Sequence, residues 1–310
     1  MSLKKIVKKI KSDFINRHES LYKRNFYKKY IVPEQRFGQE FLIREHYKKF
    51  FGQYPDLDNP QTFNEKIQWL KLNCQNSDFW GICSDKLAVR EFFEKNFGGE
   101  HLIPLLFKTQ NWRDISPDNI PNEPCIVKAN HGSGWYEIIR NKEDVDYDAL
   151  QKKCMRWLNS NYYYIGMEPQ YKNIEPWIII EKLLVTKEGK IPNDYKLAFF
   201  NGELGFVYCS IDREGENIRN IYDQNWNPMP FTWGVHGKGN DIVKPQTFDL
   251  MVKIGAEIAK NFDFVRADFY DVDGKLYYGE ITLTLGNGCD FFEPQSYDAY
   301  WGEKLKLTKK

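Results

Sequence analysis

The spacing of apolar residues separates a helical region from a longer region rich in short strands. Apolar side chains recur three and four positions apart in residues 63–72 and 87–97, which predicts two helices within a mostly helical region over residues 36–120. Short apolar and alternating runs then predict strands within residues 121–310, interrupted by helical patterns near 147–159 and 248–261. The predicted strands are 125–129, 136–140, 177–182, 194–200, 205–211, 263–270 and 276–283. This order predicts an α+β fold with antiparallel sheet.

Pairs of turn-forming residues occur within the strand-rich region. The pairs Glu188-Gly189, Asn201-Gly202 and Asp273-Gly274 fit the tight turns of hairpins. We therefore expect neighbouring strands to pair in antiparallel fashion.

Charge is concentrated at the start of the chain. Apolar residues at helical spacing and intervening lysines predict a basic amphipathic helix over residues 3–17, within a segment that extends to about residue 35. The first thirty residues carry a net charge of about +8, whereas the whole chain carries only +1. Such a helix suits an anionic membrane surface, and the alternatives are a helix docked on the protein itself or an arm for nucleic acid. The rest of the chain carries no basic stripe, so we expect no nucleic-acid partner.

Composition narrows the class of protein. The chain has 310 residues, of which 42% are hydrophobic, enough for a substantial core. Its six cysteines form no C-x-x-C pair, so neither a disulfide framework nor a zinc knuckle is indicated. The N-terminus lacks the apolar stretch of a secretory signal, and no apolar run is long enough to span a membrane. We expect a cytoplasmic protein, peripheral on the inner membrane face if the basic segment binds lipid.

The segment PCIVKANHGSGW, residues 124–135, is typical of a strand followed by a phosphate-binding loop. Lys128 projects from the end of the apolar run as a point charge. The glycines that follow allow backbone N–H groups to approach an anion closely. An ordinary hairpin loop is the alternative interpretation.

Three further clusters carry candidate chemistry. Residues 178–184 (IIIEKLL) predict a strand that ends in a carboxylate and apolar residues suited to an adenine ring. Arg266 and Asp268 lie on one face of a predicted strand, because alternate residues share a face. Glu280 on the next strand is placed to join Asp268 in an oxygen-rich Mg²⁺ site. The alternatives are a cross-strand salt bridge for Arg266 and Asp268, a solvated strand residue for Glu280, and a surface pair for Glu181 and Lys182.

Taken together, the order of these motifs resembles the ATP-grasp superfamily, which includes D-alanine–D-alanine ligase. The resemblance rests on D-K, I-V-K with its glycine loop, I-I-E-K-L-L, R-x-D and G-E over residues 85–288. Residues 64–69, 85–90, 193–196, 200–202 and 279–282 are similar to the TupA-like branch, which is associated with cell-surface polysaccharide biosynthesis. The resemblance implies two α+β subdomains that clamp ATP, preceded by a mostly helical region.

Residue roles follow from this resemblance. It implies that Lys86 and Lys128 contact phosphates beneath a closing loop. That loop consists of His131, Gly132, Ser133 and Gly134. The adenine contacts implied are Glu181, Lys182, Leu183 and Leu184, and the ribose contact is Asp194. The metal ligands implied are Asp268, Glu280 and Thr282, and the catalytic residues are Arg266 and Lys196.

Thr282 departs from the superfamily pattern, because many members have Asn at that position. A hydroxyl is a poorer metal ligand than an amide oxygen, which leaves the number of metal ions open. Asn287 is a candidate to compensate.

The reaction implied is carboxylate activation by ATP and Mg²⁺, followed by attack of an amine to form an amide. In this branch the expected partners are a uronic acid or other carboxylate of a surface glycan and an amino acid or amine. A kinase acting on a glycan hydroxyl, or a non-catalytic protein that binds membrane or nucleic acid through the basic segment, are the alternatives. The sequence contains no evident Ser/His/Asp or Cys/His arrangement for covalent catalysis.

Overall fold

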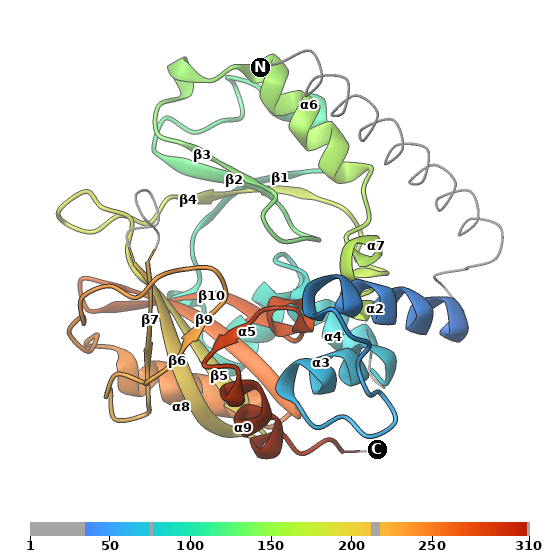
Figure 1. Ribbon diagram of the computed structural model, residues 1–310. Coiled ribbons are helices and arrows are strands. Elements are labelled where there is room, and N and C mark those ends of the chain that lie inside the picture. Colours follow the sequence, from blue (N-terminus) through green and yellow to red (C-terminus); the bar gives the residue numbers. More distant parts are fainter. Residues whose placement is uncertain (1–34, 75–76, 212–217, 309–310) are drawn as a thin grey trace, which may run out of the picture. The chain divides into compact units, whose positions relative to one another are not determined.

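The computed structural model describes residues 35–74, 77–211 and 218–308 (Figure 1), so the predicted helix over residues 3–17 lies outside the described part. The chain divides into two compact units, Met1–Tyr54 and Pro55–Lys310. In the first unit, α2 (Arg36–Phe51) ends at Gly52, which has a φ of 74° and donates its N–H to Lys48 O. A left-handed residue at this point is an ordinary helix stop.

The second unit contains a four-stranded antiparallel sheet in the order β1-β4-β2-β3. Its strands are β1 (Leu105–Thr109), β2 (Cys125–Ala129), β3 (Tyr136–Ile139) and β4 (Ile178–Lys182). Cys125 and Val127 pack with Leu150 and Cys154 of α6 (Tyr147–Leu158) in one apolar cluster. Because strand side chains alternate, Lys128 is left on the face opposite α6.

A five-stranded antiparallel sheet in the same unit has the order β10-β9-β5-β6-β7. Its strands are β5 (Asp194–Phe200), β6 (Glu203–Ile211), β7 (Ile218–Tyr222), β9 (Phe264–Val272) and β10 (Lys275–Thr282). The helix α8 (Phe248–Ala259) contacts β5, β6 and β9 and buries Met251 and Ile258 in the main core. Figure 1 shows α8 on one side of this sheet and the four-stranded sheet on the other. The polar face of β5 and β9 therefore lies toward the four-stranded sheet.

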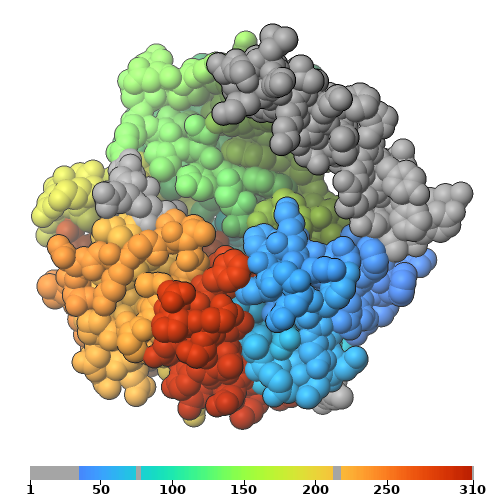
Figure 2. Space-filling view, viewed as in Figure 1, coloured from blue at the N-terminus to red at the C-terminus, as the bar shows by residue number. Residues whose placement is uncertain are grey.

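Short helices and strands complete the second unit. They are α3 (Phe63–Leu72), α4 (Ser77–Ser84), α5 (Val89–Phe97), α7 (Tyr163–Gly166), α9 (Ser296–Lys304), β8 (Thr232–Trp233) and β11 (Phe292–Glu293). The 3₁₀ turns are η1 (Gly99–His101), η2 (Trp112–Asp114), η3 (Lys142–Asp144), η4 (Pro169–Tyr171) and η5 (Leu285–Gly288). Thr62 and Glu65 form a capping box at the start of α3. In Figure 2 the red residues near the C-terminus lie beside the light-blue residues that include α3.

The predicted strands and helices of the second unit are present, with ends shifted by a few residues. Asn201-Gly202 joins β5 to β6 and Asp273-Gly274 joins β9 to β10, with positive φ at all four residues. Glu188-Gly189 does not form the predicted hairpin, because its turn, closed by Thr186 N–H to Lys190 O, lies in the loop between β4 and β5.

Four strands escaped prediction: β1, β7 and the two-residue strands β8 and β11. The segment forming β1 lies within the region predicted as mostly helical, and its pairing with the distant β4 fixes it as a strand. The strand β7 is held by pairing with β6. Among the described residues, none of the helices combines the length and apolar character needed to cross a membrane.

Candidate active site

A cavity of about 630 Å³ lies between the inner faces of the two sheets. Both sheets contribute charged side chains to its lining, and Ile126 and Ile138 contribute apolar ones. Fourteen of the sixteen predicted site residues line it. These are Lys86, Lys128, Gly132, Ser133, Gly134, Glu181, Lys182, Leu183, Leu184, Asp194, Lys196, Arg266, Asp268 and Glu280, with His131 and Thr282 outside the lining.

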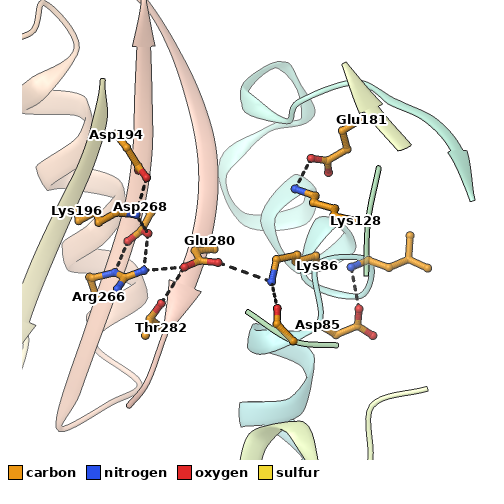
Figure 3. Close-up of polar contacts among 12 residues, drawn as sticks. Asp85, Lys86, Lys128, Glu181, Asp194, Lys196, Arg266, Asp268, Glu280 and Thr282 are labelled. Atoms are coloured by element: carbon orange, nitrogen blue, oxygen red, sulfur yellow. Dashed lines mark hydrogen bonds and ion pairs between the residues drawn. The ribbon is translucent and has the colours of Figure 1, made fainter. Parts of the chain in front are cut away.

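Arg266 holds two carboxylates together on the five-stranded sheet (Figure 3). Its Nε donates to Asp268 Oδ1 and its Nη2 to Asp268 Oδ2, both at 2.6 Å. The same Nη2 donates to Glu280 Oε1 at 2.7 Å, and Nη1 donates to the Tyr208 hydroxyl at 2.8 Å. A planar guanidinium can serve all these acceptors at once because its donors point in fixed directions.

Lys196 adds a second cation to this group. Its Nζ lies 2.6 Å from Asp194 Oδ2 and 2.6 Å from Asp268 Oδ2. Burial alone would lower the pKa of Lys196, but the two carboxylates raise the pKa above its usual value. The lysine therefore stays charged and ties β5 to β9.

Glu280 faces cations from two directions. Arg266 approaches Oε1, and Lys86 Nζ lies 3.7 Å from Oε2. Burial raises the pKa of Glu280, but Lys86 and Arg266 outweigh it and hold the pKa well below the usual range. Glu280 is therefore an ionised carboxylate at neutral pH.

Lys128 and Glu181 form the main ion pair on the four-stranded sheet, with Nζ and Oε2 2.6 Å apart. Arg90 of α5 reaches the other oxygen of Glu181 at 3.1 Å. Lys86 Nζ donates to Gly132 O at 2.7 Å, so this lysine also contacts the glycine loop. Lysines and carboxylates thus alternate across the cavity, a charge pattern suited to a phosphate and its metal ion.

The glycine loop joins β2 to β3, so the segment is both a hairpin connection and part of the cavity wall. His131 is buried and anchors the loop. Its Nδ1 lies 2.9 Å from Asn130 Oδ1, and its Nε2 lies 3.0 Å from Trp157 O. Burial lowers the pKa of His131. A Cβ at Gly132 would lie 2.7 Å from the Trp135 ring, so the close packing there requires glycine.

Two of the three predicted metal ligands face the cavity, and the third does not. Asp268 and Glu280 offer carboxylate oxygens, and Mg²⁺ in proteins is commonly held by one or two carboxylates together with substrate phosphates. Glu280 keeps 35% of its side chain exposed, which leaves room for such a ligand, so the pair fits the ion. The Thr282 hydroxyl instead donates to Glu280 Oε1 at 3.3 Å and orients that carboxylate. Among the described residues, no group of three or more His, Cys, Asp or Glu side chains forms a metal site.

Asn287 does not line the cavity. Its Oδ1 accepts a hydrogen bond of 2.6 Å from Lys71 Nζ, which also donates to Gly166 O at 2.8 Å. Lys71 is almost completely buried. The structure thus places Asn287 in a polar network that joins α3 to the loop after β10.

This network makes stability depend on pH. Burial lowers the pKa of Lys71 to about 8, whereas an unfolded lysine titrates near 10.5. Between these values the unfolded chain binds more protons than the native chain, so rising pH stabilises the native state. We therefore compare the free energy of unfolding of the wild type with that of Lys71→Met. The difference between the two should increase by about 1–2 kcal/mol in favour of the wild type between about pH 7.5 and pH 9.5.

Urea unfolding at several pH values measures this difference, in which the other titrating groups largely cancel. Lys66→Met provides the matched control, because Lys66 also donates to backbone carbonyls, at 2.7 and 2.8 Å, but is much less buried. A stability difference for Lys71→Met that stays flat over this pH range would contradict the prediction.

Sequence reasoning missed Tyr208 and Arg219, which line the cavity, and Arg90, which contacts Glu181 in the cavity wall. Arg90 stands within the D-K-L-A-V-R motif but carried no predicted role. Tyr208 lies in a run of buried residues of β6, a pattern that indicates a strand but not which face meets a ligand. Arg219 belongs to β7, which was not predicted at all, so no pattern placed it in the cavity.

A cavity between two antiparallel sheets, lined by lysines and by two carboxylates that fit Mg²⁺, is typical of nucleotide-binding proteins. The chain matches the TupA-like ATP-grasp family over residues 65–306 and belongs to that family. Its fold is therefore the ATP-grasp fold, and the superfamily to which it belongs comprises ATP-dependent ligases. No curated protein matches the chain.

Solved structures similar to this chain include two D-alanine–D-alanine ligases. The Bacillus anthracis enzyme has 14% identity and a TM-score of 0.39, with 68% of this chain and 64% of that chain covered. The Helicobacter pylori enzyme has 15% identity and a TM-score of 0.42, with 73% of this chain and 62% of that chain covered. The ATP-grasp ligase PsnB, solved with its minimal precursor, Mg and ADP, has 11% identity and a TM-score of 0.39, with 71% and 58% covered. The chain thus spans less than two thirds of the length of these proteins.

Proposed function

We propose that this protein is an ATP-dependent carboxylate–amine ligase that forms an amide through an acylphosphate. The observation that carries the proposal is the arrangement of Arg266, Asp268 and Glu280 opposite Lys86 and Lys128 in one cavity. Family membership supports the same chemistry. Cations on both walls are suited to bind the phosphates of ATP and to offset the charge that develops during transfer.

In the proposed reaction, a carboxylate oxygen attacks the γ-phosphorus, the bond to the β-phosphate oxygen breaks and ADP leaves. An amine then attacks the acyl carbon, loses a proton and expels phosphate. Lys86 and Lys128 bind phosphate oxygens, and Arg266 stabilises the oxyanion of the tetrahedral intermediate. Asp268 and Glu280 would hold Mg²⁺, which supplies further neutralisation of phosphate charge when bound.

The adenine end of the cavity is assigned to β4 and the residues that follow it. Glu181, Lys182, Leu183 and Leu184 line this end, and apolar Ile126 and Ile138 lie on β2 and β3 of the same sheet. An apolar slot with a few polar groups at its edge suits a purine ring. Asp194, on the opposite sheet, is the proposed ribose contact.

For the acceptor, we propose a uronic acid or other carboxylate of a surface polysaccharide or its precursor, joined to an amino acid or amine. The TupA-like resemblance supports this role in capsule or cell-envelope synthesis. The charge of residues 1–30 supports a peripheral position on the inner, cytoplasmic face of the membrane, where anionic lipid attracts basic segments.

Nucleotide binding tests the proposal first. We expect calorimetry to show Mg-ATP binding by the wild type and a loss of about tenfold or more in affinity for Lys128→Ala and for Asp268→Asn. The first change removes a phosphate contact, and the second removes a carboxylate from the metal pair. Lys153→Ala is the matched control, because Lys153 forms an equally short ion pair of 2.6 Å with Glu137 outside the cavity. Wild-type affinity in both cavity variants would contradict the proposed site.

Product trapping then separates a ligase from a kinase. Hydroxylamine attacks an acylphosphate and gives a stable hydroxamate, whereas it leaves a phosphoester intact. We expect the wild type with ATP, Mg²⁺, D-glucuronate and hydroxylamine to form ADP, phosphate and a hydroxamate. A stable phosphorylated sugar without hydroxamate would identify the glycan kinase instead.

A further inference from the structure

Arg219 differs from the other basic residues that line the cavity. Five lysine or arginine side chains of the lining each lie within 4 Å of a carboxylate. These are Lys86, Lys128, Lys182, Lys196 and Arg266. Across the described ranges 35–74, 77–211 and 218–308, Arg219 has no carboxylate at ion-pair distance. A cation that faces a cavity without an acidic partner is available to an anionic ligand.

The guanidinium of Arg219 is nevertheless held in place. Its carbon Cζ lies 4.8 Å from the ring centroids of both Tyr208 and Trp233, and its Nη1 donates to Trp233 O at 3.0 Å. Nε is buried and has no hydrogen-bond partner within the described part of the chain. Contacts with the two aromatic rings and the hydrogen bond to a backbone carbonyl hold the guanidinium, so its position is prepared before a ligand arrives.

Sheet register places Arg219 in line with the proposed reaction centre. Arg219 on β7 pairs with Ser210 on β6, and Ser210 lies in register with Asp194 on β5. All three line the cavity. In the adjacent row, Tyr208 pairs with Lys196, which pairs with Asp268. The polar face therefore continues across the sheet from the metal pair to Arg219.

Tyr208 connects Arg219 with Arg266. Its hydroxyl accepts a hydrogen bond from Arg266 Nη1, and its ring centroid lies 5.7 Å from Arg266 Cζ. The same ring is in contact with Arg219. The guanidinium groups of Arg219 and Arg266 thus both contact the Tyr208 side chain. A ligand bound by Arg219 would therefore lie next to the proposed reaction centre.

Two titratable side chains complete the surroundings of Arg219. His236 lines the cavity, and the structure shows no hydrogen bond for its ring among the described residues. Asp290 exerts a favourable charge effect on Arg219, but it lies beyond ion-pair distance and outside the cavity lining. Asp290 therefore offsets part of the cost of burying the guanidinium without occupying the cavity face.

We propose that Arg219, with Ser210 and His236, binds the carboxylate of the acceptor substrate beside Arg266. A carboxylate is planar, as is the guanidinium, and a charge-assisted hydrogen bond between them is short and directional. Arg219 acts as a substrate-binding and positioning residue that presents this carboxylate for attack on ATP. The inference rests on the proposed function, because it assigns one of the two substrates of that reaction.

A binding experiment with defined probes tests this subsite. The full chain is saturated with Mg²⁺ and the non-hydrolysable analogue AMP-PNP, and D-glucuronate is titrated while tryptophan fluorescence is followed. D-glucose is the neutral probe, and Trp233 beside Arg219 is a local reporter. We expect saturable binding of D-glucuronate only, weakened about tenfold or more by Arg219→Gln and less by Arg219→Lys.

The matched control is Arg113→Gln, because Arg113 also stacks on a tryptophan, with Cζ 4.1 Å from the Trp112 ring, but lies outside the cavity. It should bind D-glucuronate as the wild type does. Thermal unfolding identifies any Arg219 variant that fails to fold, and Arg219→Lys then provides the comparison. The affinity for AMP-PNP should stay within about twofold in the folded Arg219 variants.

Each other outcome overturns the inference. If Arg219→Gln weakens AMP-PNP binding by the same factor as D-glucuronate binding, Arg219 contacts the nucleotide. If the variant keeps its D-glucuronate affinity, or if the wild type treats D-glucuronate and D-glucose alike, Arg219 does not recognise a sugar carboxylate. Failure of the wild type to bind AMP-PNP would count against the proposed function itself, whereas failure of D-glucuronate alone would count against this subsite.

Discussion

Replacing Arg266 by lysine is expected to reduce hydroxamate formation from D-glucuronate by about 10²–10³-fold. The substitution keeps the positive charge but loses the planar fork. Arg266 contacts both oxygens of Asp268, one oxygen of Glu280 and the hydroxyl of Tyr208. A lysine ammonium is a compact point charge and cannot serve all these groups in their observed positions. The two carboxylates would then lose their common partner beside the site of transfer.

Steady-state rates with ATP, D-glucuronate and hydroxylamine measure this effect, together with AMP-PNP affinity and thermal stability. We expect the fall to appear in kcat, with nucleotide affinity changed by less than about tenfold, because Lys86 and Lys128 remain. Arg113→Lys is the control for an arginine-to-lysine exchange away from the cavity. A folded Arg266→Lys variant with the wild-type kcat would show that Arg266 has only a structural role.

The sequence predicted most of the strands that carry these residues, because their signal is local. Alternating and apolar runs bounded by turn residues located β2, β5 and β9 closely. By contrast, β1 is fixed by hydrogen bonds to β4, which is distant in sequence, and β7 by hydrogen bonds to β6. A single sequence contains no direct record of such pairing, so these strands were missed.

The predicted site followed the same division. Arg266 and Asp268 are two residues apart on one strand, so the alternation of side chains was enough to place them on one face. The sequence did not show the full set of contacts that these side chains make. In the structure, Arg266 bridges Asp268 to Glu280, and Lys196 contacts both Asp194 and Asp268. These contacts depend on sheet order and on a register shift in β10 next to Glu280. His131 shows the same limit, because a loop histidine proved to be a buried anchor.

Gly302→Ala is expected to destabilise the protein by about 3 kcal/mol, near the upper end of the usual cost of overpacking. Gly302 lies in α9, where the helix packs against the start of α3. A Cβ at this position would collide with Gln61 O and lie 2.8 Å from the Thr62 carbonyl carbon, and both are backbone atoms that no rotamer change can move. Relief therefore requires α9 to shift away from α3.

Such a shift would also strain the hydrogen bonds that join the two helices. Lys66 Nζ donates to Gly302 O at 2.7 Å, and Asn64 N–H donates to Asp298 Oδ1 at 2.9 Å. We expect the midpoint of thermal unfolding to fall by roughly 6–12 °C. Nucleotide affinity of the folded protein should be unchanged, since Gly302 does not line the cavity.

Gly237→Ala separates crowding from the general effect of replacing a glycine. A Cβ at Gly237 would meet no atom within 4 Å, so this substitution should leave the unfolding midpoint nearly unchanged. Calorimetry of the two variants measured side by side makes the comparison. Unfolding of Gly302→Ala at the wild-type temperature would contradict the prediction. It would show that α9 can shift away from α3 without loss of stability.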